Sequence, residues 1–235
     1  MPRADVPSAE GVFRPSAYTA ALLRQMLLNR DRFAGANVLD IGCGGGVLLA
    51  AAGEMGAARL CGIDIEADAL LETERLLATL APSPTRAVEL HRGDLFAPIG
   101  ERRFDVVLAN LPHFPMSEAA VDGRRRRWSS GGVDGRAHLD PFVARLGDRL
   151  ADGGMAFATH NAFLGIASTK SLAAANGLTL SIVDRVLVPV LPAKLAVMTP
   201  AIRARELRQT LHQFGPHAFG EVLVIALTRQ TEAAP

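Results

Sequence analysis

The segment VLDIGCGGG, residues 38–46, constrains the fold more than any other part of this chain. Its apolar first half is typical of a buried strand. Its glycines allow a tight turn and a close approach to a ligand, where a Cβ atom would collide. Residues 47–55, VLLAAAGEM, follow at once and are predicted to form a helix. A strand, a glycine loop and a helix in this order are typical of nucleotide-binding α/β domains, in which a helix N-terminus faces the ligand.

Two acidic residues indicate the kind of ligand. Asp64 ends a second apolar segment, residues 60–65, about 20 residues after the loop, where a carboxylate binds a ribose in dinucleotide-binding domains. Asp40 lies at the end of the first strand, where its charge would repel a pyrophosphate and attract a cation. S-adenosylmethionine (SAM) carries both a sulfonium and an α-ammonium group. The two residues therefore favour SAM over a nicotinamide cofactor.

The composition bounds the class of protein. A chain of 235 residues with 49% apolar residues is long enough for one large α/β domain, and a net charge of +1 provides no overall attraction to nucleic acid or membranes. The two cysteines, Cys43 and Cys61, form neither a disulfide framework nor a zinc set, so we predict no metal site. No apolar run reaches the ~18 residues of a membrane span. A cytoplasmic protein is predicted.

Helices and strands are predicted to alternate in a single domain over residues 15–230, which predicts a doubly wound sheet with ligands at the carboxyl ends of its strands. The predicted helices are residues 17–29, 47–55, 66–80, 139–150 and 164–176. The predicted strands are residues 38–41, 60–65, 88–92, 104–110, 155–160, 178–190 and 219–229. We expect residues 1–14 to be flexible, residues 231–235 to be disordered, and residues 192–217 to be irregular and to form a flap over the site.

The sequence Asn110-Leu111-Pro112-His113 ends the strand predicted at residues 104–110, across the cleft from the glycine loop. It resembles the Asn-Pro-Pro-Tyr motif of methyltransferases that modify planar nitrogens. The lone pair of such a nitrogen is delocalised, so orienting its N–H groups is more useful than removing a proton. The resemblance implies that Asn110 and the following backbone carbonyl accept those hydrogens, that Pro112 stiffens the turn, and that His113 provides a flat stacking face.

Other side chains leave alternatives open. His113, and His160 at the end of the fifth predicted strand, would also serve as bases near neutral pH, which allows a hydroxyl acceptor. His160 and Asn161 are predicted to line the acceptor pocket, and capping of a helix is an alternative role for Asn161. Asp94 resembles the third motif of SAM-dependent methyltransferases, in which a carboxylate and a neighbouring backbone N–H, here that of Leu95, contact the adenine.

At larger scale, the order of motifs resembles the HemK-like glutamine methyltransferases, which modify the Gly-Gly-Gln motif of translation release factors. The resemblance rests on residues 12–15 with Thr19, on the motifs above, and on residues 110–115, 131–135 and 220–223. It implies a class I fold: a three-layer α/β/α sandwich around a mostly parallel seven-stranded sheet whose last strand is antiparallel. It also implies a set of cofactor-binding residues, namely Asp40, Gly42, Cys43, Gly44, Asp64, Ile65, Asp94, Leu95 and Asn110.

The expected activity is transfer of a methyl group from SAM to a planar nitrogen, with Asn110, Pro112 and His113 as catalytic residues and a protein glutamine or a small-molecule amide or amine as acceptor. One alternative is a small-molecule O-methyltransferase of secondary metabolism that uses His113 or His160. Another is an rRNA, tRNA or DNA base methyltransferase, in which Arg124 to Arg127 bind phosphates and Trp128 stacks on a base. A non-catalytic binding module is a third alternative.

Overall fold

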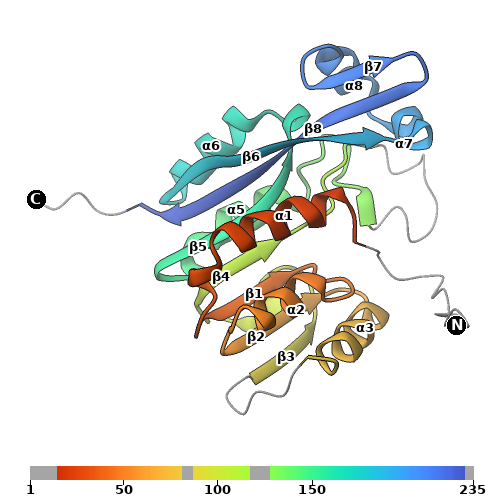
Figure 1. The fold of residues 1–235 in the computed structure, drawn as a ribbon. Coiled ribbons are helices and arrows are strands. Elements are labelled where there is room, and N and C mark those ends of the chain that lie inside the picture. Colours follow the sequence, from red (N-terminus) through yellow and green to blue (C-terminus); the bar gives the residue numbers. More distant parts are fainter. Residues whose placement is uncertain (1–14, 81–86, 117–127, 231–235) are drawn as a thin grey trace, which may run out of the picture.

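One twisted sheet forms the middle layer of the protein (Figure 1). The computed structural model describes residues 15–80, 87–116 and 128–230. In this part of the chain seven strands follow the order β3-β2-β1-β4-β5-β8-β6. An eighth strand, β7, pairs with the first residues of β8. The expectations for residues 1–14, 124–127 and 231–235 concern segments outside the described residues.

The sheet is mostly parallel, as predicted. The strands are β1 (Asn37–Ile41), β2 (Arg59–Asp64), β3 (Ala87–Arg92), β4 (Phe104–Ala109), β5 (Leu150–Asn161), β6 (Leu178–Val190), β7 (Leu211–Phe214) and β8 (His217–Arg229). Strands β1 to β5 run parallel to one another, whereas β8 is antiparallel to β5, β6 and β7. The predicted class I fold with an antiparallel last strand is confirmed.

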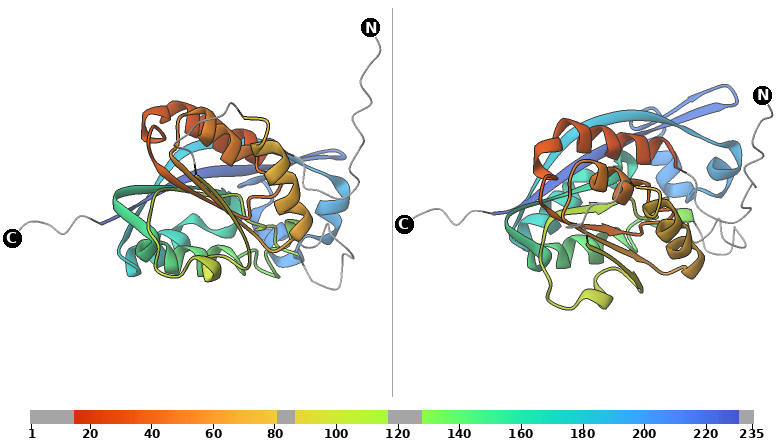
Figure 2. Two further views of the ribbon diagram at one scale, coloured as in Figure 1. Left: turned by 90° about the horizontal axis from the view of Figure 1, so that it is seen from below. Right: turned by 60° about the horizontal axis from the view of Figure 1, so that its bottom comes forward.

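Helices cover both faces of the sheet. The helices are α1 (Ala17–Leu28), α2 (Val47–Glu54), α3 (Ala67–Leu77), α5 (Leu139–Leu146), α6 (Ile166–Ala175), α7 (Pro192–Val197) and α8 (Pro200–Glu206). Short 3₁₀ turns are Arg30–Arg32, Ala97–Ile99, Gly147–Arg149 and Ala162–Leu164. Helices α1 to α3 lie on one side of the sheet, and α5 and α6 lie on the other, which makes the predicted three-layer sandwich (Figure 2).

Strand β1 separates two hydrophobic cores. Leu39 and Ile41 pack in the core beneath α5, which contains Phe142, whereas Val38 packs in the core beneath α1, which contains Leu22. Because side chains alternate along a strand, Asp40 shares the face of Val38 and points toward α1 and α2. The alternation therefore places a carboxylate at the end of a buried strand, inside the protein.

Several predicted boundaries were wrong. The helix predicted at residues 139–150 ends at Leu146, because a 3₁₀ turn and then β5 take over the remaining residues. The fifth strand begins at Leu150 and not at residue 155, because Gly153 and Gly154 lie within β5, where the pairing with β4 is irregular between Phe104 and Val106. A local glycine signal thus gave way to pairing with a distant strand.

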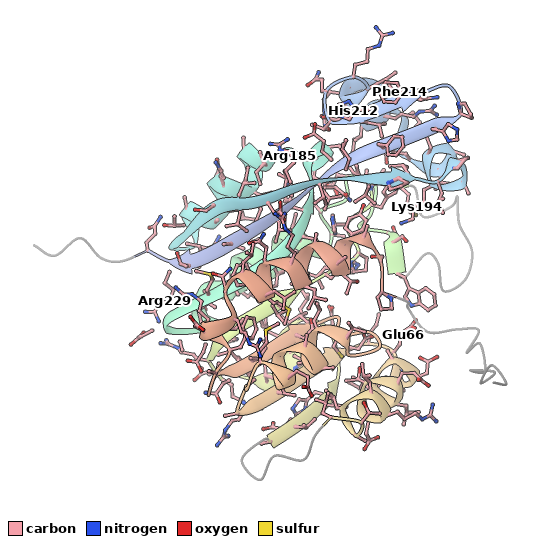
Figure 3. All side chains as sticks on the ribbon, in the orientation of Figure 1. Glu66, Arg185, Lys194, His212, Phe214 and Arg229 are labelled. Carbon is pink, nitrogen blue, oxygen red and sulfur yellow. The ribbon has the colours of Figure 1, made fainter. Side chains whose placement is uncertain are left out.

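The segment predicted to be irregular, residues 192–217, is the largest error. It forms α7, α8 and β7 (Figures 1 and 3). The side chains of Leu195, Met198 and Ile202 in this segment are buried. A proline opens each of the two helices, at a position where its missing N–H costs nothing. Helices of six and seven residues are too short to show an apolar period in the sequence.

The helices of the described residues include none that is long and apolar enough to cross a membrane.

Candidate active site

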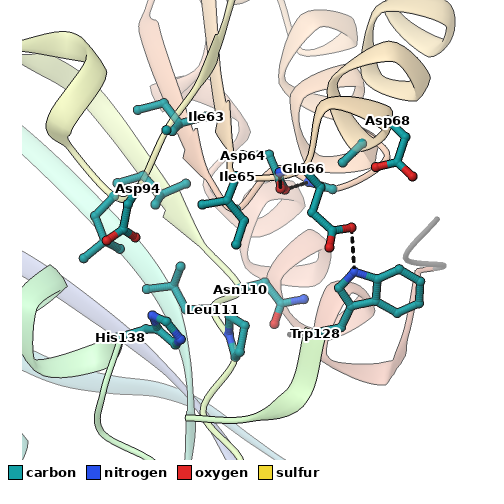
Figure 4. A pocket seen from close by; sticks show the side chains of 17 residues that line it. Ile63, Asp64, Ile65, Glu66, Asp68, Asp94, Asn110, Leu111, Trp128 and His138 are labelled. Carbon is teal, nitrogen blue, oxygen red and sulfur yellow. Dashed lines mark hydrogen bonds between the residues drawn. The ribbon is translucent and has the colours of Figure 1, made fainter. Parts of the chain in front are cut away.

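Polar residues from neighbouring strands meet at the carboxyl edge of the sheet. Asp64 is the last residue of β2, Asp94 lies two residues after β3, and Asn110 directly follows β4. Together with Ile65 and Leu95 they line one cavity (Figure 4). Parallel strands end at the same edge of a sheet, and ligands of doubly wound folds bind there. The structure thus brings together the residues that the sequence predicts for adenosine binding.

The glycine loop has the backbone conformation that its composition predicts. Gly42, Gly44 and Gly46 adopt φ values of 70°, 54° and 78°, which side-chain-bearing residues rarely adopt. The N–H groups of Gly42 and Cys43 donate to the carbonyl of Ile63, at 2.8 and 3.0 Å. These two N–H groups therefore tie the loop to β2 and do not face a ligand.

Gly46 is the glycine of the loop that we expect to tolerate substitution least. An added Cβ would lie 2.7 Å from Cγ2 of Thr73, whose hydroxyl donates to the carbonyl of Gly44 at 2.7 Å. Gly46→Ala should therefore lower the free energy of unfolding by more than the ~1–2 kcal/mol of the backbone conformation alone. Gly177→Ala is the matched control, because Gly177 has a φ of 69° and open space around it. Denaturant titration would contradict this account if the two variants lost equal stability.

Asp64 is held rigidly in the cavity. Its Oδ2 accepts from the N–H of Gly44 and its Oδ1 from the N–H of Glu66, both at 2.9 Å. Burial raises the pKa of Asp64, and the two N–H donors oppose that shift. A carboxylate with each oxygen already oriented keeps further lone pairs for two hydroxyl groups. This geometry suits the predicted contact with a ribose.

Asp40 is buried without a partner. Its side chain is 1% exposed, and neither carboxylate oxygen has a hydrogen-bond partner among the described residues. Burial raises the pKa of Asp40 well above its usual value, and the charge of Asp64 adds to the shift. Asp40 lines a second, smaller cavity with Thr19, Cys43 and Asn110. A cation in this cavity would relieve the cost of an unpaired buried carboxylate, so the site fits the α-ammonium group of SAM.

Asn110 borders both cavities, and threonines fix its side chain. The hydroxyl of Thr159 on β5 donates to its Oδ1 at 2.9 Å, and its Nδ2 donates to Oγ1 of Thr19 on α1 at 3.4 Å. In this arrangement Oδ1 faces Thr159 on β5 and Nδ2 faces Thr19 on α1. An amide oxygen accepts two hydrogen bonds, so Oδ1 retains one lone pair for a ligand.

His113 does not occupy the predicted stacking position. Leu111 and Pro112 line the larger cavity, whereas His113 is 4% exposed and lines neither cavity. Its Nδ1 donates to the carbonyl of Leu111 at 2.5 Å, and its ring packs edge-on against Tyr18. Burial lowers the pKa of His113 to about 4, so the imidazole is neutral at pH 7. His113 orients the loop instead of facing a ligand.

His160 and Asn161 also lie behind the cavities. Nε2 of His160 is 2.9 Å from the hydroxyl of Thr169, and burial lowers the pKa of His160 to about 3. Asn161 makes no helix-capping bond; its Nδ2 donates to the carbonyl of His113 at 3.2 Å, and its Oδ1 accepts from the hydroxyl of Tyr18 at 2.8 Å. Neither residue lines the two cavities, so the predicted pocket position is wrong for both.

Sequence reasoning missed several residues of the site. Thr159 is a polar residue at the carboxyl end of a buried strand, a signal that would have identified it. Glu66 and His138 also line the larger cavity, but no neighbouring residue in the sequence indicates that either belongs to a binding site. Trp128 also lines this cavity and was predicted only as a partner of nucleic acid (Figure 4).

Comparisons with known proteins agree with the fold. The sequence profile of a methyltransferase domain matches residues 38–132. A protein of Methanocaldococcus jannaschii, provisionally named as a protein N5-glutamine methyltransferase, is 28% identical over 179 residues, which cover 76% of this chain and 86% of that protein. The release factor glutamine methyltransferase of Geobacter sulfurreducens is 30% identical over 126 residues, covering 51% of this chain and 43% of that protein.

A solved structure shows the same fold. The 16S rRNA N2 G1207 methyltransferase of T. thermophilus, in complex with AdoMet and guanosine, has a TM-score of 0.56 at 20% identity, covering 95% of this chain and 45% of that one. Three findings indicate the same class of protein: the fold, the carboxylates at the strand ends and the matched methyltransferase domain. The chain therefore contains a methyltransferase domain with the class I SAM-dependent fold, and its relatives include proteins named as glutamine methyltransferases.

Proposed function

We propose that this enzyme transfers the methyl group of SAM to a planar nitrogen, and that the nitrogen is the side-chain amide of a protein glutamine. The observation that carries the proposal is the fixed Oδ1 of Asn110, which lies where the two cavities meet. The glutamine methyltransferases among its relatives support the choice of acceptor.

In the proposed reaction, the chain's own groups orient the nitrogen. Asn110 Oδ1 and the carbonyl of Leu111 each accept one N–H of the acceptor amide. This holds the nitrogen lone pair toward the donor and weakens its conjugation with the carbonyl. His113 fixes the carbonyl of Leu111 through its Nδ1–H and leaves one lone pair for the acceptor.

Asp40 and Asp64 hold the two ends of the donor on the other side of Asn110. When bound, SAM supplies an electrophilic methyl group on a positively charged sulfur. The nitrogen electron pair forms the new N–C bond as the C–S bond breaks, the sulfur leaves as a neutral thioether, and an N–H proton passes to solvent. No buried base is needed, because the nitrogen becomes acidic once it carries the methyl group.

The alternatives make weaker use of the site. An O-methyltransferase needs a base beside its hydroxyl, but His113 and His160 lie outside both cavities and have pKa values of about 4 and 3. A nucleic-acid base or a small-molecule amide also presents a planar nitrogen, so the acceptor itself must be identified.

Incubation with tritiated SAM tests the proposal. The acceptors are a purified release factor that contains Gly-Gly-Gln, its Gln→Ala variant, and a fractionated lysate. We expect label in the wild-type release factor and none in the Gln→Ala variant. Label found only in RNA or small molecules of the lysate would contradict a protein glutamine acceptor.

A further inference from the structure

The buried position of His113 leaves a planar acceptor without the aromatic face expected at the fourth position of the motif. Among the described residues that line the larger cavity, the flat rings are Trp128 and His138. His138 lies on the side of Asp94, where the adenine is expected, and Trp128 lies on the side of Asn110 (Figure 4).

Trp128 is attached firmly to the motif that carries Asn110. The N–H of Phe114 donates to the carbonyl of Ser129 at 2.9 Å, and the N–H of Gly131 donates back to the carbonyl of Phe114 at 2.9 Å. These two hydrogen bonds pair residues 129–131, which directly follow Trp128, with Phe114, which directly follows His113. The backbone that carries the indole therefore moves with the loop that carries the orienting oxygens.

The ring itself is oriented from the opposite wall. Nε1 of Trp128 donates to Oε2 of Glu66 at 3.1 Å, across the cavity mouth from the end of β2 to the loop after β4 (Figure 4). A bond from the edge of an indole fixes the direction of its face, because a planar ring has few remaining conformations once its N–H is held. Since Glu66 follows Asp64, the proposed ribose contact, by two residues, the ring lies beside the proposed donor site.

We propose that Trp128 is the aromatic wall against which the acceptor amide lies, and that it takes the place of the missing aromatic residue at position 113. This inference rests on the proposed function, because only a flat acceptor benefits from a flat wall. Glu66 acts as a positioning residue for the indole. The carboxamide of a glutamine side chain would enter between the indole and Pro112, with its N–H groups toward Asn110.

Methyl transfer to the Gly-Gly-Gln release factor at saturating SAM tests this role. Trp128→Ala should lower kcat/KM for the release factor by about three- to tenfold or more, whereas Trp128→Phe should retain most of it. The Kd for SAM, measured by calorimetry, should change less than about twofold in both variants. Phe214→Ala is the matched control, because Phe214 is an exposed aromatic residue on β7 outside the site, and it should change neither quantity.

Equal kcat/KM values for the wild type and Trp128→Ala would overturn the inference, and so would a loss of SAM affinity as large as the loss of transfer. A failure of the proposed function can be told apart from a failure of this inference. If the proposed function is wrong, the wild-type enzyme itself leaves the release factor unlabelled. Fluorescence gives a second measurement, since Trp128 is the single tryptophan of the chain. With S-adenosylhomocysteine bound, a Gly-Gly-Gln peptide should shift the emission, and an unchanged emission at saturating peptide would also overturn the inference.

Discussion

Asn110→Ala should lower kcat for methyl transfer by about 10²–10³-fold while the Kd for SAM changes only a few fold. The loss is that of one preorganised hydrogen-bond partner of the reacting group. The effect on SAM should be small because the charged groups proposed to hold the donor are the carboxylates of Asp40 and Asp64, which this substitution leaves in place. Single-turnover kinetics with the release factor would measure the chemical step separately from product release.

Thr159→Val provides a graded control for Asn110. It removes the hydroxyl that donates to Oδ1 of Asn110 and leaves a side chain of similar shape. Oδ1 then stays in place but is less well oriented, so kcat should fall by about three- to tenfold, less than in Asn110→Ala. If Asn110→Ala changed the Kd for SAM and kcat by the same factor, Asn110 would be a donor-binding residue and the proposed orientation of the nitrogen would be wrong.

Asp40→Asn should weaken SAM binding by about 10–100-fold and should also stabilise the ligand-free protein. The weakening is the loss of a charge-assisted hydrogen bond with the α-ammonium group. The stabilisation follows because the carboxylate is buried without a partner, and a neutral amide costs less to bury. A gain of about 1 kcal/mol corresponds to a rise in Tm of about 2–4 °C for a domain of this size.

The pH dependence has a defined sign. Because the pKa of Asp40 is raised in the folded protein, its ionisation destabilises the fold as pH rises above the unfolded value near 3.9. The α-ammonium group favours the ionised carboxylate, so SAM should bind more tightly as pH rises toward the raised pKa, with release of a proton. Calorimetry in two buffers with different ionisation enthalpies measures that proton. In Asp40→Asn the proton release should disappear.

Asp64→Ala is the contrasting variant. It should also weaken SAM binding, but it leaves the N–H groups of Gly44 and Glu66 without their acceptor and should therefore lower stability. Opposite changes in Tm for the two aspartate variants are the expected signature of a cation site beside a rigid ribose site. If Asp40→Asn lowered Tm as Asp64→Ala does, Asp40 would be a structural residue.

The parts of the site that the sequence predicts are those at the ends of buried strands. Asp64, Asp94 and Asn110 lie at or just after the carboxyl ends of β2, β3 and β4, and parallel strands bring those ends to one edge of the sheet. Asp40 is predicted for a further reason, since a carboxylate at the end of this strand would repel a pyrophosphate and attract a cation.

The remaining features depend on contacts between distant residues. The direction of His113 is set by Tyr18 and by the carbonyl of Leu111, so a motif comparison suggests an aromatic face that the packing turns inward. The link from Trp128 to Glu66 joins residues 62 positions apart. No local period or composition encodes such contacts, which arise only when the loops close over the sheet edge.

The chemical position of the transferred methyl group tests the central claim most directly. The release factor is labelled by the wild-type enzyme with tritiated SAM and then hydrolysed in strong acid. An N-methylated glutamine amide releases its label as methylamine, which is the result that we expect. Release of the label as methanol would show transfer to a carboxyl oxygen and would contradict the account, as would label that remains on a nucleic-acid base.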